Sequence, residues 1–218
     1  MPDRRVIPLF PLGTLLVPGL VLPLHIFEPR YRRLMADLEG LPDDDRAFGV
    51  IAIREGREVG AADLPSLYDV GTLAALREAT PLEDGRFDIV TVGTERFRII
   101  DLDESLPYLR AQVEILPEVP GDRAPAAADA VRERFREYRG MFTGEDETDL
   151  PDDPRVLSYL VAAAIVIDLP GRQDLLSAES DAIRLRQELA FLRRETALIA
   201  ALPSLPAVDL VREEISPN

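Results

Sequence analysis

The sequence has 218 residues, a formal net charge of −15 at pH 7, no cysteine, no tryptophan and one histidine, His25. All 25 basic side chains are arginine. Without cysteine or lysine, this sequence lacks the side chains for thiol nucleophiles, disulfides, zinc ribbons, Schiff bases, Ser–Lys dyads and the P-loop lysine. The negative charge repels phosphate backbones and anionic lipids, so neither nucleic acid nor a membrane is an expected partner.

Four prolines interrupt the apolar stretch between residues 6 and 27. A secretory signal needs a continuous helix there, which prolines at this density prevent. The second long apolar run, residues 156–167, is too short to span a bilayer. We therefore expect a soluble, cytoplasmic protein.

The first half of the sequence predicts β-strands separated by turns. The expected strands are 6–12, 15–24, 48–53, 71–77, 87–92, 96–100 and 109–116. The prolines in the first two place them at sheet edges or strand ends. Gly93-Thr94 predicts a hairpin between the fifth and sixth strands. One helix, beginning at Pro29 and ending at Gly40, interrupts the series.

The second half predicts three helices after a linker at residues 117–125. The first begins at Pro125 and the second at Pro154, with Asp153 as its N-cap, running until Pro170. The last runs from residue 177 or 180 to about residue 202. Its leucines recur every three or four residues, which is typical of a helix that packs on other helices. We divide the sequence into a β domain (1–118), a helical subdomain (119–204) and a flexible tail (205–218).

Several sequence segments resemble the N-terminal, substrate-binding domain of Lon proteases. The segments are PLFPL at 8–12, LPLHIFEPRY at 22–31, YDVGT at 68–72 and VGTERFRI at 92–99. The resemblance covers nearly the whole sequence. It implies an α+β fold in which an N-terminal PUA-like β pseudo-barrel is followed by a C-terminal α-helical bundle with one long helix.

In full-length Lon proteases an ATPase module and a Ser–Lys peptidase follow this domain. The present sequence has no G-x-x-x-x-G-K-[ST] motif and no lysine, so it resembles a stand-alone recognition domain rather than an enzyme. We expect no catalytic residue, no cofactor and no metal ion.

Two groups of residues follow from the resemblance and from the apolar stretch. The expected structural signature is Pro18, Pro23, Glu28, Arg30, Tyr31, Gly71, Gly93, Arg96 and Phe97. Because a strand buried on one face does not need every aliphatic side chain between residues 15 and 22, some of them are candidates for a peptide-docking surface. The candidate surface is Leu16, Leu20, Leu22, His25 and Phe27.

The polar members of these groups have structural interpretations that compete with functional ones. His25 and Glu28 are spaced for an acid–base or metal pair, but we favour a strand-end histidine and a glutamate that caps the helix begun by Pro29. Glu28 is also the natural partner for Arg96. With Arg30, Tyr31 and Phe97 these two residues are candidates for a pocket that binds a peptide carboxylate, but we favour an ion pair that ties the helix to the predicted hairpin. The carboxylates between residues 144 and 153 lack the spacing of a calcium loop, so we interpret them as a solvated loop.

The expected function is therefore non-catalytic recognition of unfolded or exposed polypeptide segments, with strand addition to a free β edge as one mode. A client protein or a separate protease is the expected partner, and the chain is expected to be a monomer or a weak homodimer. Two alternatives stay open: an enzyme that uses carboxylates in the cleft between the two halves, and an RNA-binding protein of the PUA type.

Overall fold

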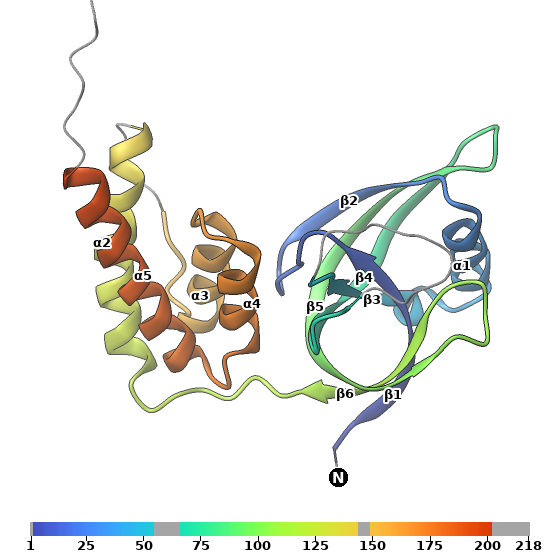
Figure 1. Ribbon diagram of the computed structural model, residues 1–218, viewed down its shortest axis with the longest axis horizontal. Coiled ribbons are helices and arrows are strands. Elements are labelled where there is room, and N and C mark those ends of the chain that lie inside the picture. Colours follow the sequence, from blue (N-terminus) through green and yellow to red (C-terminus); the bar gives the residue numbers. More distant parts are fainter. Residues whose placement is uncertain (1, 55–65, 144–148, 202–218) are drawn as a thin grey trace, which may run out of the picture.

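The computed structural model describes residues 2–54, 66–143 and 149–201 and divides into strands followed by helices (Figure 1). The first part holds β1 (Arg4–Leu12), β2 (Val21–Ile26), α1 (Pro29–Glu39), a short 3-10 turn (Asp43–Asp45), β3 (Ala47–Ala52), β4 (Val70–Pro81), β5 (Phe87–Asp103) and β6 (Arg110–Leu116). The second part holds α2 (Ala124–Thr143), α3 (Pro154–Ala164), α4 (Leu169–Ser177) and α5 (Asp181–Ala201).

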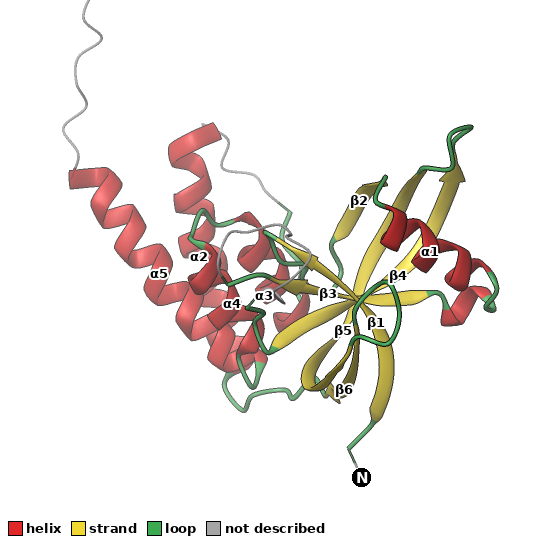
Figure 2. Cartoon of the chain, turned by 45° about the vertical axis from the view of Figure 1, so that its right-hand side comes forward, coloured by secondary structure: helices red, strands yellow, loops and turns green. Residues whose placement is uncertain are grey.

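The six strands form one sheet that closes into a barrel. Their order is β2-β5-β4-β3-β1-β6, and β5 pairs a second time with β6. The closure depends on the length of β5, because residues 87–92 pair with β2 while residues 96–103 pair with β6. Figure 2 shows the strands gathered on one side of the molecule and the bundle of helices on the other. The predicted α+β class, with a β-barrel followed by a helical bundle, is confirmed.

The prediction that the prolines lie at sheet edges or strand ends is right for Pro23 in β2 and for Pro11 near the end of β1, and wrong for Pro8 inside β1. β2 lies at the end of the strand order, whereas β1 lies between β3 and β6. Pro8 is the last β1 residue paired with β6, and beyond it β1 pairs with β3 instead. Proline is tolerated inside this sheet because it marks the point where β1 changes partner.

The predicted hairpin at Gly93-Thr94 is wrong, because β5 continues through both residues as one strand. The turn lies earlier, at residues 82–86, where the Leu82 N–H donates to the Arg86 carbonyl at 2.8 Å. Gly93 has a different role. A Cβ at this position would lie 2.3 Å from the carbonyl oxygen of Val17, so glycine lets the loop before β2 pass directly over the strand.

The barrel has an apolar interior that α1 closes on one side. Tyr31, Leu34, Met35 and Leu38 form the buried face of α1, which the sequence predicts correctly from Pro29 onward. A second cluster surrounds Phe97, whose side chain is fully buried. These two clusters fix the positions of the strands, and the strand positions determine which side chains face the solvent.

The helical part contains one helix more than the sequence predicts. α3 ends at Ala164 because the chain turns extended at Ile165, and α4 begins separately with Asp168 as its N-cap. The predicted N-cap of α3 is present, since Asp153 Oδ1 accepts from the Arg155 and Val156 N–H groups. α5 is the predicted long helix, and it packs with α2 and α3 around a shared apolar core.

Candidate polypeptide-binding surface

The loop between β1 and β2 lies against the barrel and turns sharply into β2. The Leu20 N–H donates to the Val17 carbonyl at 3.2 Å, and Gly19 between them has a φ of +83°. A Pro18-Gly19 pair is suited to this turn, because proline presets the first central position and glycine accepts the positive φ of the second. The Thr72 hydroxyl donates to the Leu16 carbonyl at 2.7 Å, which anchors the loop to β4.

β2 divides its side chains between the barrel interior and the solvent. Leu22, Leu24 and Ile26 point inward and pack in the core, and the residues that alternate with them point outward. The register with β5 sets Val21 opposite Val92 and Pro23 opposite Val90 on the outer face. We define the apolar strip by five residues: Leu20, Val21, Pro23, Val90 and Val92.

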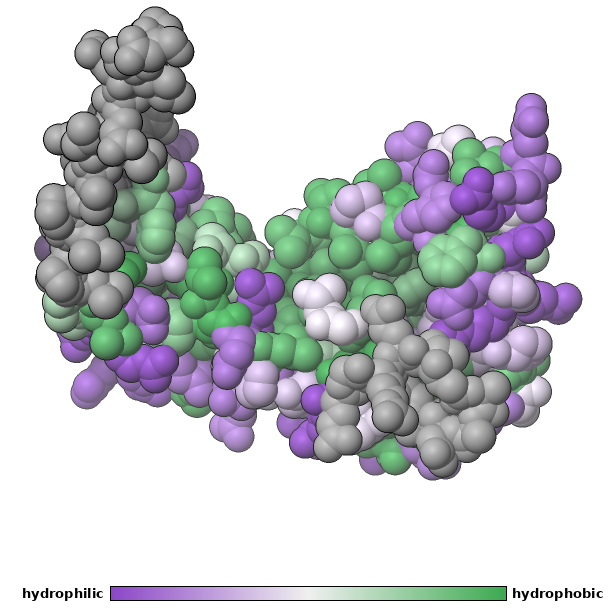
Figure 3. All heavy atoms as spheres, turned by 45° about the horizontal axis from the view of Figure 1, so that its top comes forward, coloured by the Kyte–Doolittle hydropathy of each residue, from purple (hydrophilic) through white to green (hydrophobic). Residues whose placement is uncertain are grey.

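In the apolar strip Leu20, Val21 and Pro23 are exposed and the two β5 valines are half-buried, and the strip begins beside the helices. Val21 is 55% exposed and Leu20 is 42% exposed. Val17, in the turn just before them, packs with Tyr159 of α3 and Leu176 of α4. Figure 3 shows that the surface is hollowed between the barrel and the helices, and that apolar side chains gather on the barrel side of this notch. Exposed apolar surface next to a concavity is typical of an interaction site.

The far end of β2 is polar. His25 Nδ1 lies 2.6 Å from Asp88 Oδ1, and its Nε2 lies 3.2 Å from Arg86 Nη1. Because a guanidinium can only donate, Nε2 accepts the hydrogen bond from Arg86, and the Nδ1–H donates a hydrogen bond to Asp88. Phe27 is 61% exposed and stacks beside the imidazole, with ring centroids 6.2 Å apart. An open hollow of about 390 Å³ is lined by His25 and Asp88, by Glu78 and Thr80 of β4, and by Pro23 and Val90 of the apolar strip.

The free edge of β2 is poorly suited to adding a strand. Within the described residues β2 pairs only with β5. The Gly93 N–H donates to the Leu20 carbonyl at 2.9 Å, so by the alternation of an antiparallel pair the backbone groups of residues 21, 23 and 25 point to the free edge. The middle residue is Pro23, which has no N–H to donate. Proline at this position protects an edge from pairing with another strand.

Two of the predicted contact residues have side chains that pack against the barrel interior. Leu16 is 1% exposed and packs in the barrel core, so the expectation that its side chain docks a peptide is wrong. Leu22 is half-buried against the same core. Leu20, His25 and Phe27 are exposed, but Phe27 lies at the opposite end of β2 from Leu20. Val21, Val90 and Val92, which the predicted set omitted, follow from the outward phase of β2 and its register with β5.

The predicted pairing of Glu28 with Arg96 is also wrong. Glu28 is the N-cap residue of α1, but its side chain makes no capping hydrogen bond and instead accepts from Arg30 at 2.8 Å. Arg96 points away from α1 and bonds to Glu118 at 2.8 Å. Both ends of the expected pair therefore have nearer partners, which a pattern of charges along the sequence does not reveal.

Other signature residues make contacts within the barrel. Tyr31 stacks on Phe10 with ring centroids 4.0 Å apart, and the Arg30 guanidinium lies 4.5 Å from the Tyr31 ring centroid. Gly71 lies under Phe97, where a Cβ would come within 2.5 Å of the phenyl ring. These contacts are consistent with the structural role that the sequence predicts, which stays a prediction.

The described residues bring no metal-binding cluster together. No group of three or more His, Asp or Glu side chains among them is arranged to hold a metal ion. Only two of the described carboxylates are buried, Asp181 and Glu188, and they lie seven residues apart on α5, about 10 Å along the helix axis. Burial raises the pKa of Glu188 well above its usual value, with Arg184 as a smaller opposing influence. This carboxyl lies inside the helical bundle and away from the notch.

The model of the ATP-dependent protease La (LON) substrate-binding domain matches residues 6–194. The chain belongs to the Lon substrate-binding domain family. Lon protease 2 of Sorangium cellulosum is 28% identical over 225 residues, which cover 98% of this chain and 27% of that protein. Lon protease 4 of the same organism is 32% identical over 217 residues, covering 96% and 26%. The chain thus spans about a quarter of the length of the curated relatives it matches.

Two solved structures show the same fold as this Lon domain. The Lon N-terminal domain protein from Xanthomonas campestris matches with a TM-score of 0.61 at 22% identity, over 86% of this chain and 98% of that one. The N-terminal domain of the Mycobacterium avium complex Lon protease matches with a TM-score of 0.66 at 17% identity, over 87% and 98%. None of the described helices has the length and apolar character needed to cross a bilayer.

Proposed function

We propose that this Lon domain binds exposed apolar segments of other polypeptides at the apolar strip and carries out no chemistry of its own. One observation carries the proposal: apolar side chains from β2 and β5 share one solvent-facing surface beside the notch. The membership of the chain in a family of substrate-binding domains supports it. The clients are unfolded proteins or partner proteins, including a separate protease, and the setting is the cytoplasm.

Recognition on this surface depends on side chains rather than on a shared β ladder. Pro23 leaves the middle of the free edge without a donor, so main-chain pairing has little to offer a peptide. Burial of apolar side chains is non-directional and therefore tolerates many client sequences. Each contact is small, so we expect a dissociation constant on the order of micromolar or weaker for one domain.

The charge distribution supports a protein client over a nucleic acid. Several barrel arginines have carboxylates beside them: Arg5 with Asp3 and Glu95, Arg54 with Asp69, Arg86 with Asp84, and Arg110 with Asp103. Such pairs cancel the positive field that phosphate contacts require. We therefore propose that the domain does not bind RNA. We also propose that it acts as a monomer or a weak homodimer.

The test places a charge in the strip and the same charge elsewhere on the barrel. Val21→Glu is expected to weaken binding to carboxymethylated, permanently unfolded α-lactalbumin at least about tenfold in fluorescence anisotropy, which corresponds to about 1.4 kcal/mol. Val6→Glu is the matched control, because Val6 is 60% exposed on β1, which does not pair with β2. Both variants are checked by circular dichroism. Equal binding by the two folded variants would contradict the proposed surface.

A further inference from the structure

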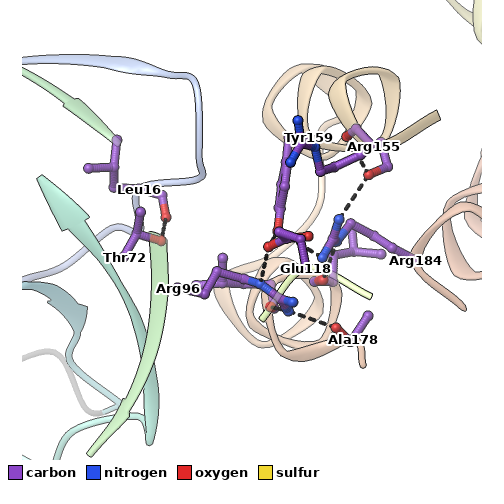
Figure 4. Close-up of polar contacts among 11 residues, drawn as sticks. Leu16, Thr72, Arg96, Glu118, Arg155, Tyr159, Ala178 and Arg184 are labelled. Atoms are coloured by element: carbon purple, nitrogen blue, oxygen red, sulfur yellow. Dashed lines mark hydrogen bonds and ion pairs between the residues drawn. The ribbon is translucent and has the colours of Figure 1, made fainter. Parts of the chain in front are cut away.

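One polar network crosses the junction between the barrel and the helices (Figure 4). It begins at Arg96 of β5, whose side chain is 2% exposed. The Arg96 guanidinium donates to Glu118 Oε1 at 2.8 Å and, through Nη1, to the carbonyls of Leu176 at 2.8 Å and Ala178 at 2.7 Å. One barrel side chain therefore holds both the segment that leaves the barrel and the C-terminal end of α4.

The network continues into the bundle through Tyr159. Its hydroxyl donates to the same Glu118 Oε1 at 2.5 Å and accepts from Arg184 Nη2 at 3.0 Å. Arg184 is fully buried, lies 3.9 Å from the Tyr159 ring centroid, and also donates to the Ser158 hydroxyl at 2.9 Å and the Leu175 carbonyl at 2.9 Å. The middle of α3, the C-terminal end of α4 and the first turn of α5 are thus linked to β5 by directional bonds.

Apolar packing alone gives this junction little directional definition. The buried apolar cluster that spans it has only four members, with three half-buried residues packed against them: Val17, Val70, Tyr159 and Leu176, then Leu15, Leu116 and Ala163. Hydrophobic contact is non-directional, so a small cluster tolerates several orientations of the bundle. A guanidinium presents its donors in a rigid planar fork, so its hydrogen bonds require a defined arrangement of the acceptors around it.

The energetics also favour a role in orientation over one in stability. A buried ion pair loses much of its attraction to the cost of removing both charges from water, and apolar replacements of such pairs are often neutral for stability. Such a replacement does remove the directional hydrogen bonds that fix the orientation of the two charged groups. Elsewhere on the junction, Gln173 Nε2 donates to the Val70 carbonyl at 2.8 Å.

We propose that Arg96 is a positioning residue that holds the helical bundle in one orientation to the barrel, through the end of α4 and through Glu118 with its partner Tyr159, and so sets the opening of the notch beside the apolar strip. The effect on the orientation is independent of any ligand. The effect on client binding rests on the proposed function.

The absence of native cysteine allows the orientation to be measured directly. Asp101→Cys on the barrel and Gln187→Cys on α5 are exposed positions for a pair of spin labels, whose separation is read by pulsed electron paramagnetic resonance. The unsubstituted network is expected to give one narrow distance distribution, and Arg96→Met a shifted or broadened one. The control is Arg110→Met, which removes an ion pair contained within the barrel and is expected to leave the distribution unchanged.

A second variant covers the case in which Arg96→Met does not fold. Tyr159→Phe keeps the ring and removes only the hydroxyl that joins Glu118 to Arg184, so it is expected to broaden the distribution with little change in melting temperature. A folded variant of either kind with an unchanged distribution overturns the proposal. Failure of the native domain to bind an unfolded protein overturns the proposed function but leaves the distance measurement intact.

Discussion

The barrel and the helical bundle are built on different kinds of interior. The two barrel clusters are apolar, and the buried threonine hydroxyls beside them, on Thr72 and Thr91, donate to backbone carbonyls. The bundle encloses ionisable and amide side chains, among them Arg184, Glu188 and Gln173. Packing therefore determines the stability of the barrel, whereas that of the bundle also depends on ionisable groups. The two parts are expected to respond differently to loss of volume and to pH.

The largest expected effect is a loss of packing in the barrel. Phe97→Ala removes a fully buried ring that packs directly against Gly71, and it is expected to cost about 3–5 kcal/mol of unfolding free energy. Urea denaturation followed by circular dichroism measures it. Phe142→Ala at the end of α2 is the control, since that ring is 65% exposed and its loss is expected to cost about 0.5 kcal/mol or less. A cost for Phe97→Ala as small as that of the control would show that the barrel does not depend on its packed core.

A pH-dependent effect is expected in the bundle, where Glu188 has a raised pKa. Between the unfolded and the folded pKa, the folded state holds a proton that the unfolded state has released, so stability falls as pH rises, by roughly 1 kcal/mol per pH unit. Glu188→Gln keeps the shape and removes the titration. Its stability relative to the native chain is therefore expected to increase from pH 5 to pH 7.

Thermal melts across that pH range measure this difference. Glu179→Gln, at an exposed position just before α5, is the control and is expected to show no such trend. A constant difference between Glu188→Gln and the native chain at every pH would mean that the buried carboxyl does not titrate as its surroundings indicate.

The smallest expected effect is at the start of α1. Glu28 and Arg30 form an ion pair in which each side chain is about one-third exposed. Pairs of this kind contribute about 0–1 kcal/mol, so Glu28→Ala is expected to lower the unfolding free energy by about 0.5 kcal/mol. Urea denaturation of this variant beside Phe97→Ala provides the comparison. A loss above about 2 kcal/mol would restore the structural importance that the sequence pattern suggested for Glu28.

The parts of the fold that local pattern determines were predictable. The apolar stripe after Pro29 gave α1, the alternation before residue 116 gave β6, and Asp153-Pro154 gave the start of α3. α4 was missed, although Asp168 and Pro170 repeat the same N-cap and proline pattern. Its apolar positions are too few in nine residues to give a helical period.

The misplaced residues depend on contacts between distant parts of the chain. Gly93 resembles a turn glycine, but its small size serves the loop at Val17, 76 positions earlier. The partners of Arg96 lie 22 to 82 residues away, and two of them are carbonyls that any residue could supply. The apolar strip was predicted only in part, because assigning residues to the outer face requires the register of β2 with β5.

The claim that the apolar strip holds the client is tested most directly by photo-crosslinking from defined positions. A photoreactive phenylalanine analogue at Val21 and, separately, at Val6 is irradiated with carboxymethylated α-lactalbumin at equal concentrations. The account predicts that the unfolded protein is captured from position 21 and not from position 6. Equal capture from both positions, or capture from position 6 alone, would contradict it.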